Sequence, residues 1–249
     1  ANTDTSRITR LWAYRILLKK ADNHVFDVLK QALKDTTYVE LMSGCRGFER
    51  PYNRAALSVY RYDSYELKLP NQLCFSLDSL VFFDYMKPCG FERGLLMDFK
   101  PHKIYYATVI EEADKGNDAI LPLLAQYKNP NDRQRINKLL KALLKEDGIC
   151  SYEACKAISN WNDPTFEWYA KAACQATIKQ EYYDADEVLQ LLCAYPAPWS
   201  YQILKKLLTQ KGDYSNSDTA KDYLRELYKT RPVPPIFKPL YDMYVVRKR

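Results

Sequence analysis

The chain has 249 residues, of which 47% are hydrophobic and 27% charged, the composition of a folded protein with a sizeable core. Only 7 residues are glycine, which disfavours β-rich folds with many tight turns and nucleotide-binding folds whose glycine-rich loops hold phosphate. The net charge of +6 permits binding to acidic proteins or nucleic acid and requires neither. Composition therefore favours an all-α protein.

The first predicted element is a helix over about residues 6–20, which we expect to cap one end of a helical array. Two near-identical strings follow it. Residues 47–50 and 90–93 both read Gly-Phe-Glu-Arg, and each comes shortly after a cysteine. We interpret both strings as turns of helical hairpins, so residues 1–115 are predicted to form an N-terminal helical region with two such hairpins.

Residues 58–69 do not show a clear helical pattern, because tyrosine and valine, which favour strands, alternate loosely with polar residues. The pattern fits either the end of a helix begun near Asn53 or a short hairpin, and we predict a helix that ends at about Tyr62. An irregular extended stretch closed by Pro70 is expected to follow.

Two amphipathic helices are predicted in the middle of the chain. Over residues 131–146, leucines and Ile136 form one stripe, and Lys138, Lys141 and Lys145 lie opposite. Over residues 163–180, the capping residue Asp163 precedes Pro164, and small residues allow a neighbouring helix to pack closely.

A repeat is predicted near the C-terminus, where apolar residues keep helical spacing on both sides of a Pro-x-Pro turn. Residues 188–207 match residues 224–243 at an offset of 36 positions. Turn signals at 47–50, 90–93, 129–132, 161–164, 195–198 and 231–235 continue this rhythm, with spacings in the range of helical-repeat units. Residues 116–249 are therefore predicted to form helical repeats that continue the array of the first region without a break.

One part of the chain resembles a known family. Residues 154–158, the Asn-Asp-Pro string at 162–164 and the alanine-rich helix after it look like a HEAT repeat. HEAT units carry an arginine soon after the Asp-Pro, whereas Glu167 and Trp168 stand here. The resemblance implies an all-α fold of five or six antiparallel helical hairpins stacked as an α-solenoid.

No motif for a nucleophile, a metal or a nucleotide occurs in the sequence, so no catalytic residue, metal site or cofactor is predicted. The chain has two histidines, His24 and His102, and the pair Cys150 and Cys155 has no histidine nearby. Seven scattered cysteines predict buried thiols in a reducing, cytoplasmic compartment. No apolar run is long enough to span a bilayer.

Two sets of residues are candidates for a binding surface. The basic set lies on predicted helices and comprises Arg133, Arg135, Lys138, Lys141, Lys145, Lys205 and Lys206. The aromatic set lies at predicted hairpin edges and comprises Trp161, Trp168, Tyr169 and Trp199. Each set has a structural alternative: the basic residues form a solvated helix face, and the rings pack one hairpin on the next.

By analogy with the fold, these features predict a non-enzymatic adaptor that binds another protein, with an acidic segment as its target. One alternative is a nucleic-acid-binding protein, since some HEAT-like proteins resemble DNA glycosylases; Trp161, Asp163 and Trp168 are then the residues of interest. A further alternative, for which no particular residue argues, is a bacterial or viral effector or immunity protein.

Overall fold

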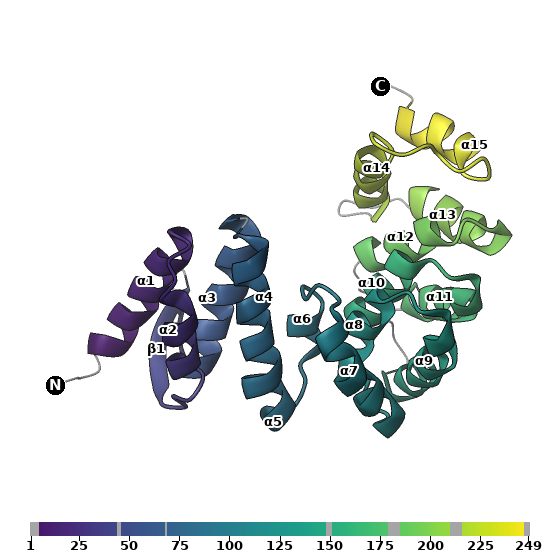
Figure 1. Cartoon of the computed structure of the whole chain (residues 1–249). Helices are drawn as coiled ribbons and strands as arrows, with labels where there is room; N and C mark the ends of the chain where they lie inside the picture. The colour runs from purple at the N-terminus through teal and green to yellow at the C-terminus, as the bar shows by residue number, and fades with distance from the viewer. Residues whose placement is uncertain are drawn as a thin grey trace. The chain divides into compact units, whose positions relative to one another are not determined.

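The computed structural model of the chain describes residues 5–43, 46–67, 69–147, 151–178, 185–209 and 216–246. It is mostly helical and contains a small two-stranded hairpin (Figure 1). Internal contacts divide the chain into two compact units, Ala1–Asp98 and Phe99–Arg249. The division predicted between residues 115 and 116 lies within the second unit. In the described ranges, none of the helices combines the length and the apolar character needed to cross a membrane.

The first unit combines helices with the hairpin. Its elements are α1 (Thr5–Lys19), α2 (Val25–Ala32), β1 (Tyr38–Ser43), β2 (Arg46–Pro51), α3 (Tyr52–Leu67), α4 (Asn71–Leu80), a π-helical turn (Val81–Met86), α5 (Lys87–Cys89) and α6 (Arg93–Leu96). The predicted N-terminal helix is confirmed as α1. It contacts α2 and α3 and buries Leu11, Tyr14 and Leu18 on one face.

The helix α3 is longer than predicted, because it continues to Leu67. The expected extended stretch after Tyr62 is therefore wrong. Within the part that was predicted to be helical, Tyr52, Ala56 and Tyr60 are buried at four-residue spacing, as one face of a helix requires.

The two Gly-Phe-Glu-Arg strings adopt different conformations. Residues 47–50 lie in β2, where Phe48 pairs with Leu41 and Arg50 with Val39 of the antiparallel strand β1. Residues 90–93 instead follow α5, which ends at Gly90 with a φ of 106°. The expectation that both strings are equivalent turns of helical hairpins is therefore wrong.

The second unit consists of helices joined by turns and loops, and no strand occurs in its described residues. Its elements are α7 (Lys103–Lys115), a 3₁₀ turn (Asp118–Ile120), α8 (Leu121–Gln126), a 3₁₀ turn (Pro130–Asp132), α9 (Arg133–Asp147), α10 (Tyr152–Trp161), a 3₁₀ turn (Pro164–Phe166), α11 (Glu167–Thr177), α12 (Ala185–Ala194), α13 (Pro198–Thr209), α14 (Asn216–Leu227), α15 (Lys238–Leu240) and a π-helical turn (Tyr241–Val246). Both helices predicted in the middle of the chain are confirmed, as α9 and α11.

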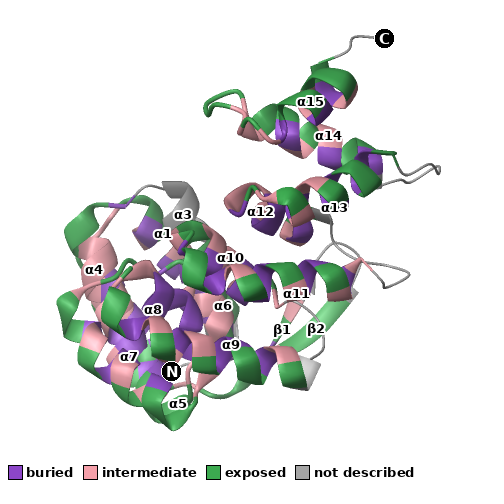
Figure 2. Cartoon of the chain, turned by 90° about the vertical axis from the view of Figure 1, so that its right-hand side faces the viewer, coloured by how far each residue is buried: buried purple, intermediate pink, exposed green. Residues whose placement is uncertain are grey.

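Alternate helices of this unit contact one another. In one series α10 contacts α8 and α12, and α12 contacts α14; in the other, α9 contacts α7 and α11, and α11 contacts α13. Buried and exposed positions alternate along α9 and α11 with the period of a helix (Figure 2). These two helices therefore face their neighbours with an apolar stripe and present a polar side to solvent, whereas α8 is buried over Leu121–Ala125.

Three turns between the two series share a four-residue pattern. Residues 127–130, 161–164 and 195–198 each begin with an aromatic residue and end with proline, at intervals of 34 positions. In the first two turns, Lys128 and Asn162 adopt left-handed φ angles of 51° and 55°. The residue before the proline then accepts a hydrogen bond from a backbone N–H two positions later, as Asn129 and Asp163 do.

The third turn also leads into a helix at its last proline, but different side chains stabilise it. Pro196 stands where the left-handed residue would be, and the residue before Pro198 is alanine, which has no capping side chain. The Ser200 hydroxyl accepts a hydrogen bond from the Ala197 N–H at 2.7 Å instead. The chain therefore re-enters a helix at the same position in all three turns.

Candidate functional site

The two arginines of the predicted basic set are engaged within the protein. Arg133, at the start of α9, forms an ion pair with Asp163 over 2.7 Å, and the Asp163 side chain is 4% exposed. Burial alone would raise the pKa of Asp163, but hydrogen bonds from Thr165 and Arg133 outweigh it and hold the pKa below its ordinary value. This pair ties the turn before α11 to α9.

Arg135 makes a similar connection between α9 and the preceding helix of its series, α7. Its guanidinium lies 2.7 Å from Asp114 of α7 and 3.2 Å from the buried Asp132. Tyr106, also on α7, donates its hydroxyl hydrogen to Asp132 at 2.8 Å. Arg133 and Arg135 therefore link successive helices, which explains their position without a binding role.

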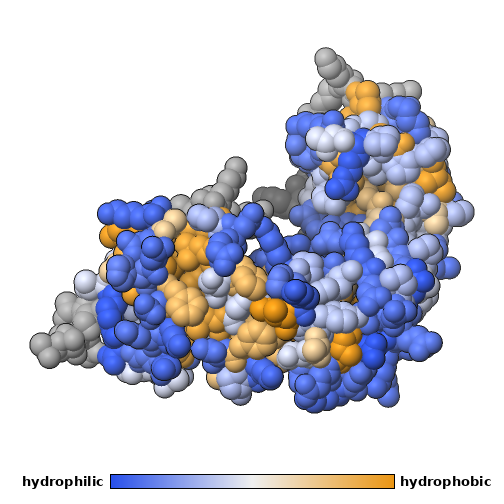
Figure 3. Space-filling model, in the orientation of Figure 1, coloured by the Kyte–Doolittle hydropathy of each residue, from blue (hydrophilic) through white to orange (hydrophobic). Residues whose placement is uncertain are grey.

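The lysines of the basic set are exposed. Lys138, Lys141 and Lys145 lie on α9, and Lys205 and Lys206 lie on α13. None of them forms an ion pair with another residue of the described ranges. The surface around α7 and α9 is mostly hydrophilic in Figure 3, as expected for a solvated helix face. Between α9 and α13 lies α11, so the structure does not bring the two lysine groups together by direct helix contact.

The aromatic set connects neighbouring helices. Trp168 donates its indole N–H to Asn137 of α9, and Trp199 donates its own to Glu167 of α11, both at 2.7 Å. Trp161 packs edge-on against Phe166, with ring centroids 5.1 Å apart. Tyr169 is fully buried and belongs to the core. These contacts match the structural alternative in which rings pack one hairpin on the next, although Trp168 keeps an exposed edge.

A groove that the sequence did not reveal crosses α10, α12 and α14. Its cavity volume is about 500 Å³. The lining side chains come from all three helices and from the segment after α14: Lys156, Ser159, Asn160, Asn162, Gln190, Cys193, Ala194, Tyr223, Leu227, Tyr228, Arg231, Pro232 and Pro234. We call this cavity the cross-helix groove.

The cross-helix groove offers hydrogen-bonding groups that the described protein leaves unused. The amides of Asn160 and Gln190 have no hydrogen-bond partner within the described ranges, and the buried Ser159 hydroxyl has none either. A side-chain amide supplies both donors and acceptors. Each can therefore pair with the N–H and C=O groups of an extended peptide.

The charge of the groove is positive. Arg231 and Lys156 both line it, and neither has a carboxylate partner among the residues that the structure describes. Burial raises the pKa of the Cys193 thiol to about 12 and moves the pKa of Tyr228 above its ordinary value, so both groups are neutral at pH 7. An acidic side chain in this groove would meet two cations, and none of the described lining residues is a carboxylate.

The groups considered for catalysis are dispersed. His24 is exposed beside Asp22, with 2.7 Å between Nδ1 and Oδ1, and His102 caps α7 by accepting from the Ile104 N–H. Asp163, the acidic residue of the glycosylase-like alternative, is held by Arg133. Over the described ranges, no three His, Cys, Asp or Glu side chains are grouped so as to hold a metal.

Among the described cysteines, Cys155 differs from the expectation of free thiols. Cys155, in α10, is disulfide-bonded, whereas Cys74, Cys89, Cys174 and Cys193 are free. Because disulfides persist in oxidising compartments, Cys155 argues against the reasoning that led from scattered cysteines to a reducing compartment.

Comparison of the chain with protein-family models, with curated proteins and with solved structures gives no match. The functional argument therefore depends on the geometry of the groove and on the chemistry of its side chains.

Proposed function

We propose that the chain is a non-enzymatic binding scaffold whose second unit is a short α-solenoid of helical hairpins. Two observations support this architecture. Alternate helices contact one another in two series, as the two layers of a solenoid do. The turn that joins the series recurs at intervals of 34 positions with the same helix entry.

The repeat class that we propose differs from the HEAT class that residues 154–180 resemble. HEAT and armadillo units have about 40–47 residues, and tetratricopeptide units about 34. The interval between the three turns equals the shorter length. We therefore propose paired helices of the α-solenoid type with a compact unit, and retain HEAT only as a description of the Asp-Pro helix start.

We propose that the cross-helix groove binds an extended segment of another protein that carries an acidic residue. The observation that carries this proposal is the set of unpaired groups on one cavity: the amides of Asn160 and Gln190 and the cation of Arg231. The amides would pair with the peptide backbone, Arg231 and Lys156 with its carboxylate, and Leu227 and the prolines with its apolar side chains.

The spacing of the helices sets the length of the bound segment. Neighbouring packed helices lie roughly 8–10 Å apart, and an extended chain advances about 3.3 Å per residue. Each helix therefore corresponds to about three peptide residues, and crossing α10, α12 and α14 takes a segment of roughly seven to nine.

Selection from a displayed library of random peptides tests this function. We expect enriched peptides to share an acidic residue near apolar ones. Arg231→Glu and Gln190→Ala should weaken their binding at least roughly tenfold, because each leaves a charged or polar partner unpaired. Lys141→Glu, on the exposed face of α9, is the matched control and should leave affinity unchanged. Failure to enrich any peptide, or weakening by Lys141→Glu alone, would contradict the proposal.

A second candidate is binding to nucleic acid through Lys138, Lys141 and Lys145, which are exposed and free of ion pairs within the described ranges. Counterion release makes such binding fall steeply with added salt. Charge reversal of these lysines should then abolish binding to single- or double-stranded DNA. Binding that is flat in salt, or unchanged by charge reversal, would remove this candidate.

A further inference from the structure

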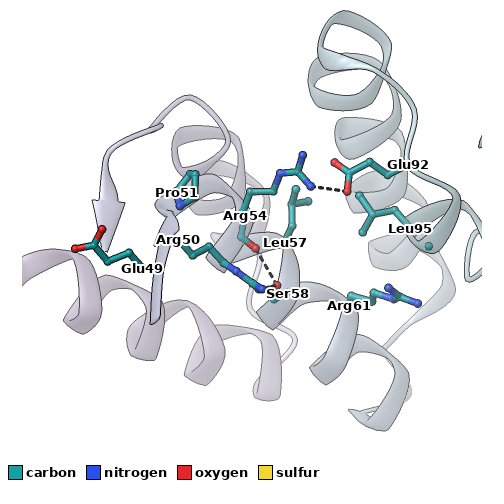
Figure 4. Close-up of a pocket in the computed structure, with 10 residues that line it drawn as sticks. Glu49, Arg50, Pro51, Arg54, Leu57, Ser58, Arg61, Glu92 and Leu95 are labelled. Atoms are coloured by element: carbon teal, nitrogen blue, oxygen red, sulfur yellow. Dashed lines mark hydrogen bonds and ion pairs between the residues drawn. The ribbon is translucent and has the colours of Figure 1, made fainter. Parts of the chain in front are cut away.

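A second cavity lies in the first unit and takes no part in the proposed peptide groove. Its volume is about 360 Å³. The end of β2, one face of α3 and the start of α6 line it with Glu49, Arg50, Pro51, Arg54, Leu57, Ser58, Arg61, Glu92, Gly94 and Leu95 (Figure 4). We call it the arginine pocket.

The local structure gathers the arginines. Arg54, Ser58 and Arg61 are spaced by four and three residues, so they share one face of α3. Arg50 reaches the same cavity from the end of β2, two residues before α3 begins. The two Gly-Phe-Glu-Arg strings thus meet here after all, because Arg50 comes from one and Glu92 from the other.

Two of the three arginines are held by carboxylates. Arg54 lies 2.6 Å from Glu92, and Arg61 lies 2.8 Å from Asp98. Tyr85 donates a further hydrogen bond to the other oxygen of Glu92, at 3.4 Å. These contacts fix α3 to residues 92–98 and orient the guanidinium groups of Arg54 and Arg61 at the cavity wall.

Arg50 is different, because no carboxylate among the described residues lies within ion-pair distance of it. Its guanidinium donates to the Ser58 hydroxyl at 2.6 Å and lies over the Phe48 ring, 5.4 Å from the centroid. Glu49 does not neutralise it, because adjacent strand residues point to opposite faces. Figure 4 shows the Glu49 carboxylate directed away from the arginines.

The pocket therefore holds the fixed guanidinium of Arg50, which has no carboxylate partner among the described residues, the ion-paired guanidinium groups of Arg54 and Arg61, and an apolar wall of Pro51, Leu57 and Leu95. A guanidinium has five donors, and its fork matches the oxygens of a phosphoryl group. We propose that the arginine pocket binds a small phosphorylated organic molecule. Arg50 and Arg54 hold its phosphoryl oxygens, the Ser58 hydroxyl orients Arg50, and the leucines contact its organic part.

Calorimetric titration of the full chain tests this with three probes: inorganic phosphate, phenyl phosphate and phenol. We expect saturable binding of phosphate and tighter binding of phenyl phosphate, because its ring buries apolar area against Leu57 and Leu95. Phenol should not bind, since the phosphoryl contacts supply the affinity. Absence of saturable binding by both phosphate compounds, or equal binding of phenol, would overturn the proposal.

Variants identify the site. Arg50→Ala should weaken phenyl phosphate at least roughly tenfold, and Arg50→Lys should weaken it less, because the charge remains while the fork is lost. Lys34→Ala removes an exposed charge of the same unit and is the control, with unchanged affinity expected. If Lys34→Ala weakens binding as much as Arg50→Ala, the effect is a general one of charge and the pocket is not the site. Far-UV circular dichroism shows that each variant compared is folded.

Discussion

At the scale of single residues, the buried Asp163 side chain both caps a helix and forms an ion pair. It caps the turn before α11, pairs with Arg133 across two helices and is almost wholly buried. The Asn-Asp-Pro string predicted the capping role from sequence. The partnership with Arg133, 30 positions away, depends on the tertiary packing of α9 beside α11, which local sequence patterns do not encode.

Removing this pair should lower stability. Arg133→Ala leaves a buried carboxylate without its cation, and because Arg133 is 43% exposed, solvent screening limits the loss to about 1–2 kcal/mol. Asp163→Ala also removes the cap, so about 2–3 kcal/mol is expected. Urea unfolding measures both, and a loss below the error for both variants would contradict the assigned role.

The same pair predicts a dependence on pH. The pKa of Asp163 is lower in the folded state than its ordinary value, so its contribution is present above that value and is lost as pH falls through the folded-state pKa. The stability difference between wild type and Asp163→Asn should therefore be constant near pH 7 and shrink below about pH 4. A difference that grows with acid would contradict this sign.

Thiol reactivity separates the free cysteines. Burial raises the pKa of Cys174 to about 12, whereas Cys89 is exposed. Because the thiolate is the reactive form, iodoacetamide at pH 8 should label Cys89 first and Cys174 only after unfolding. Mass spectrometry of the timed reaction measures the order. It also tests the disulfide, since Cys155 should gain a label only after reduction.

At the scale of elements, amphipathic patterns predicted α1, α9 and α11, because each buries one stripe and exposes the other. The pattern failed for the end of α3, which continues to Leu67, and for residues 47–50, which pair with β1. Sequence comparison aligned the C-terminal hairpins at an offset of 36, whereas the three turns recur at 34. The residues with left-handed φ angles in equivalent turns are Lys128 and Asn162, so no glycine in the sequence marks these turns.

The turn geometry makes a prediction at this scale. Lys128 has a φ of 51°, which costs a side-chain-bearing residue about 1 kcal/mol, so Lys128→Gly should be neutral or stabilising by up to about 1 kcal/mol. Lys138→Gly is the matched control inside α9, where glycine should cost about 1 kcal/mol. Thermal unfolding compares the two variants. Equal destabilisation by both would contradict the left-handed assignment.

At the scale of the molecule, the two units offer different binding chemistry. The proposed groove of the second unit presents amides and two cations along three helices, and the arginine pocket of the first presents a fixed guanidinium cluster. Of the candidate residues named from sequence, Arg133 and Arg135 connect helices and the tryptophans link neighbouring ones. The groove residues were missed because Asn160, Gln190 and Arg231 become neighbours only when α10, α12 and α14 stack.

Site-specific photo-crosslinking tests the central claim most directly. A photoreactive amino acid is placed in turn at Ser159, Ala194 and Tyr223, which line the groove on α10, α12 and α14 and leave its amides and cations in place, and at Lys141 as control. With a peptide selected by display, the three groove positions should crosslink to peptide residues that progress along its sequence by about three per helix. Crosslinks from all three positions to the same peptide residue, or crosslinks from Lys141 alone, would contradict an extended segment bound across the helices.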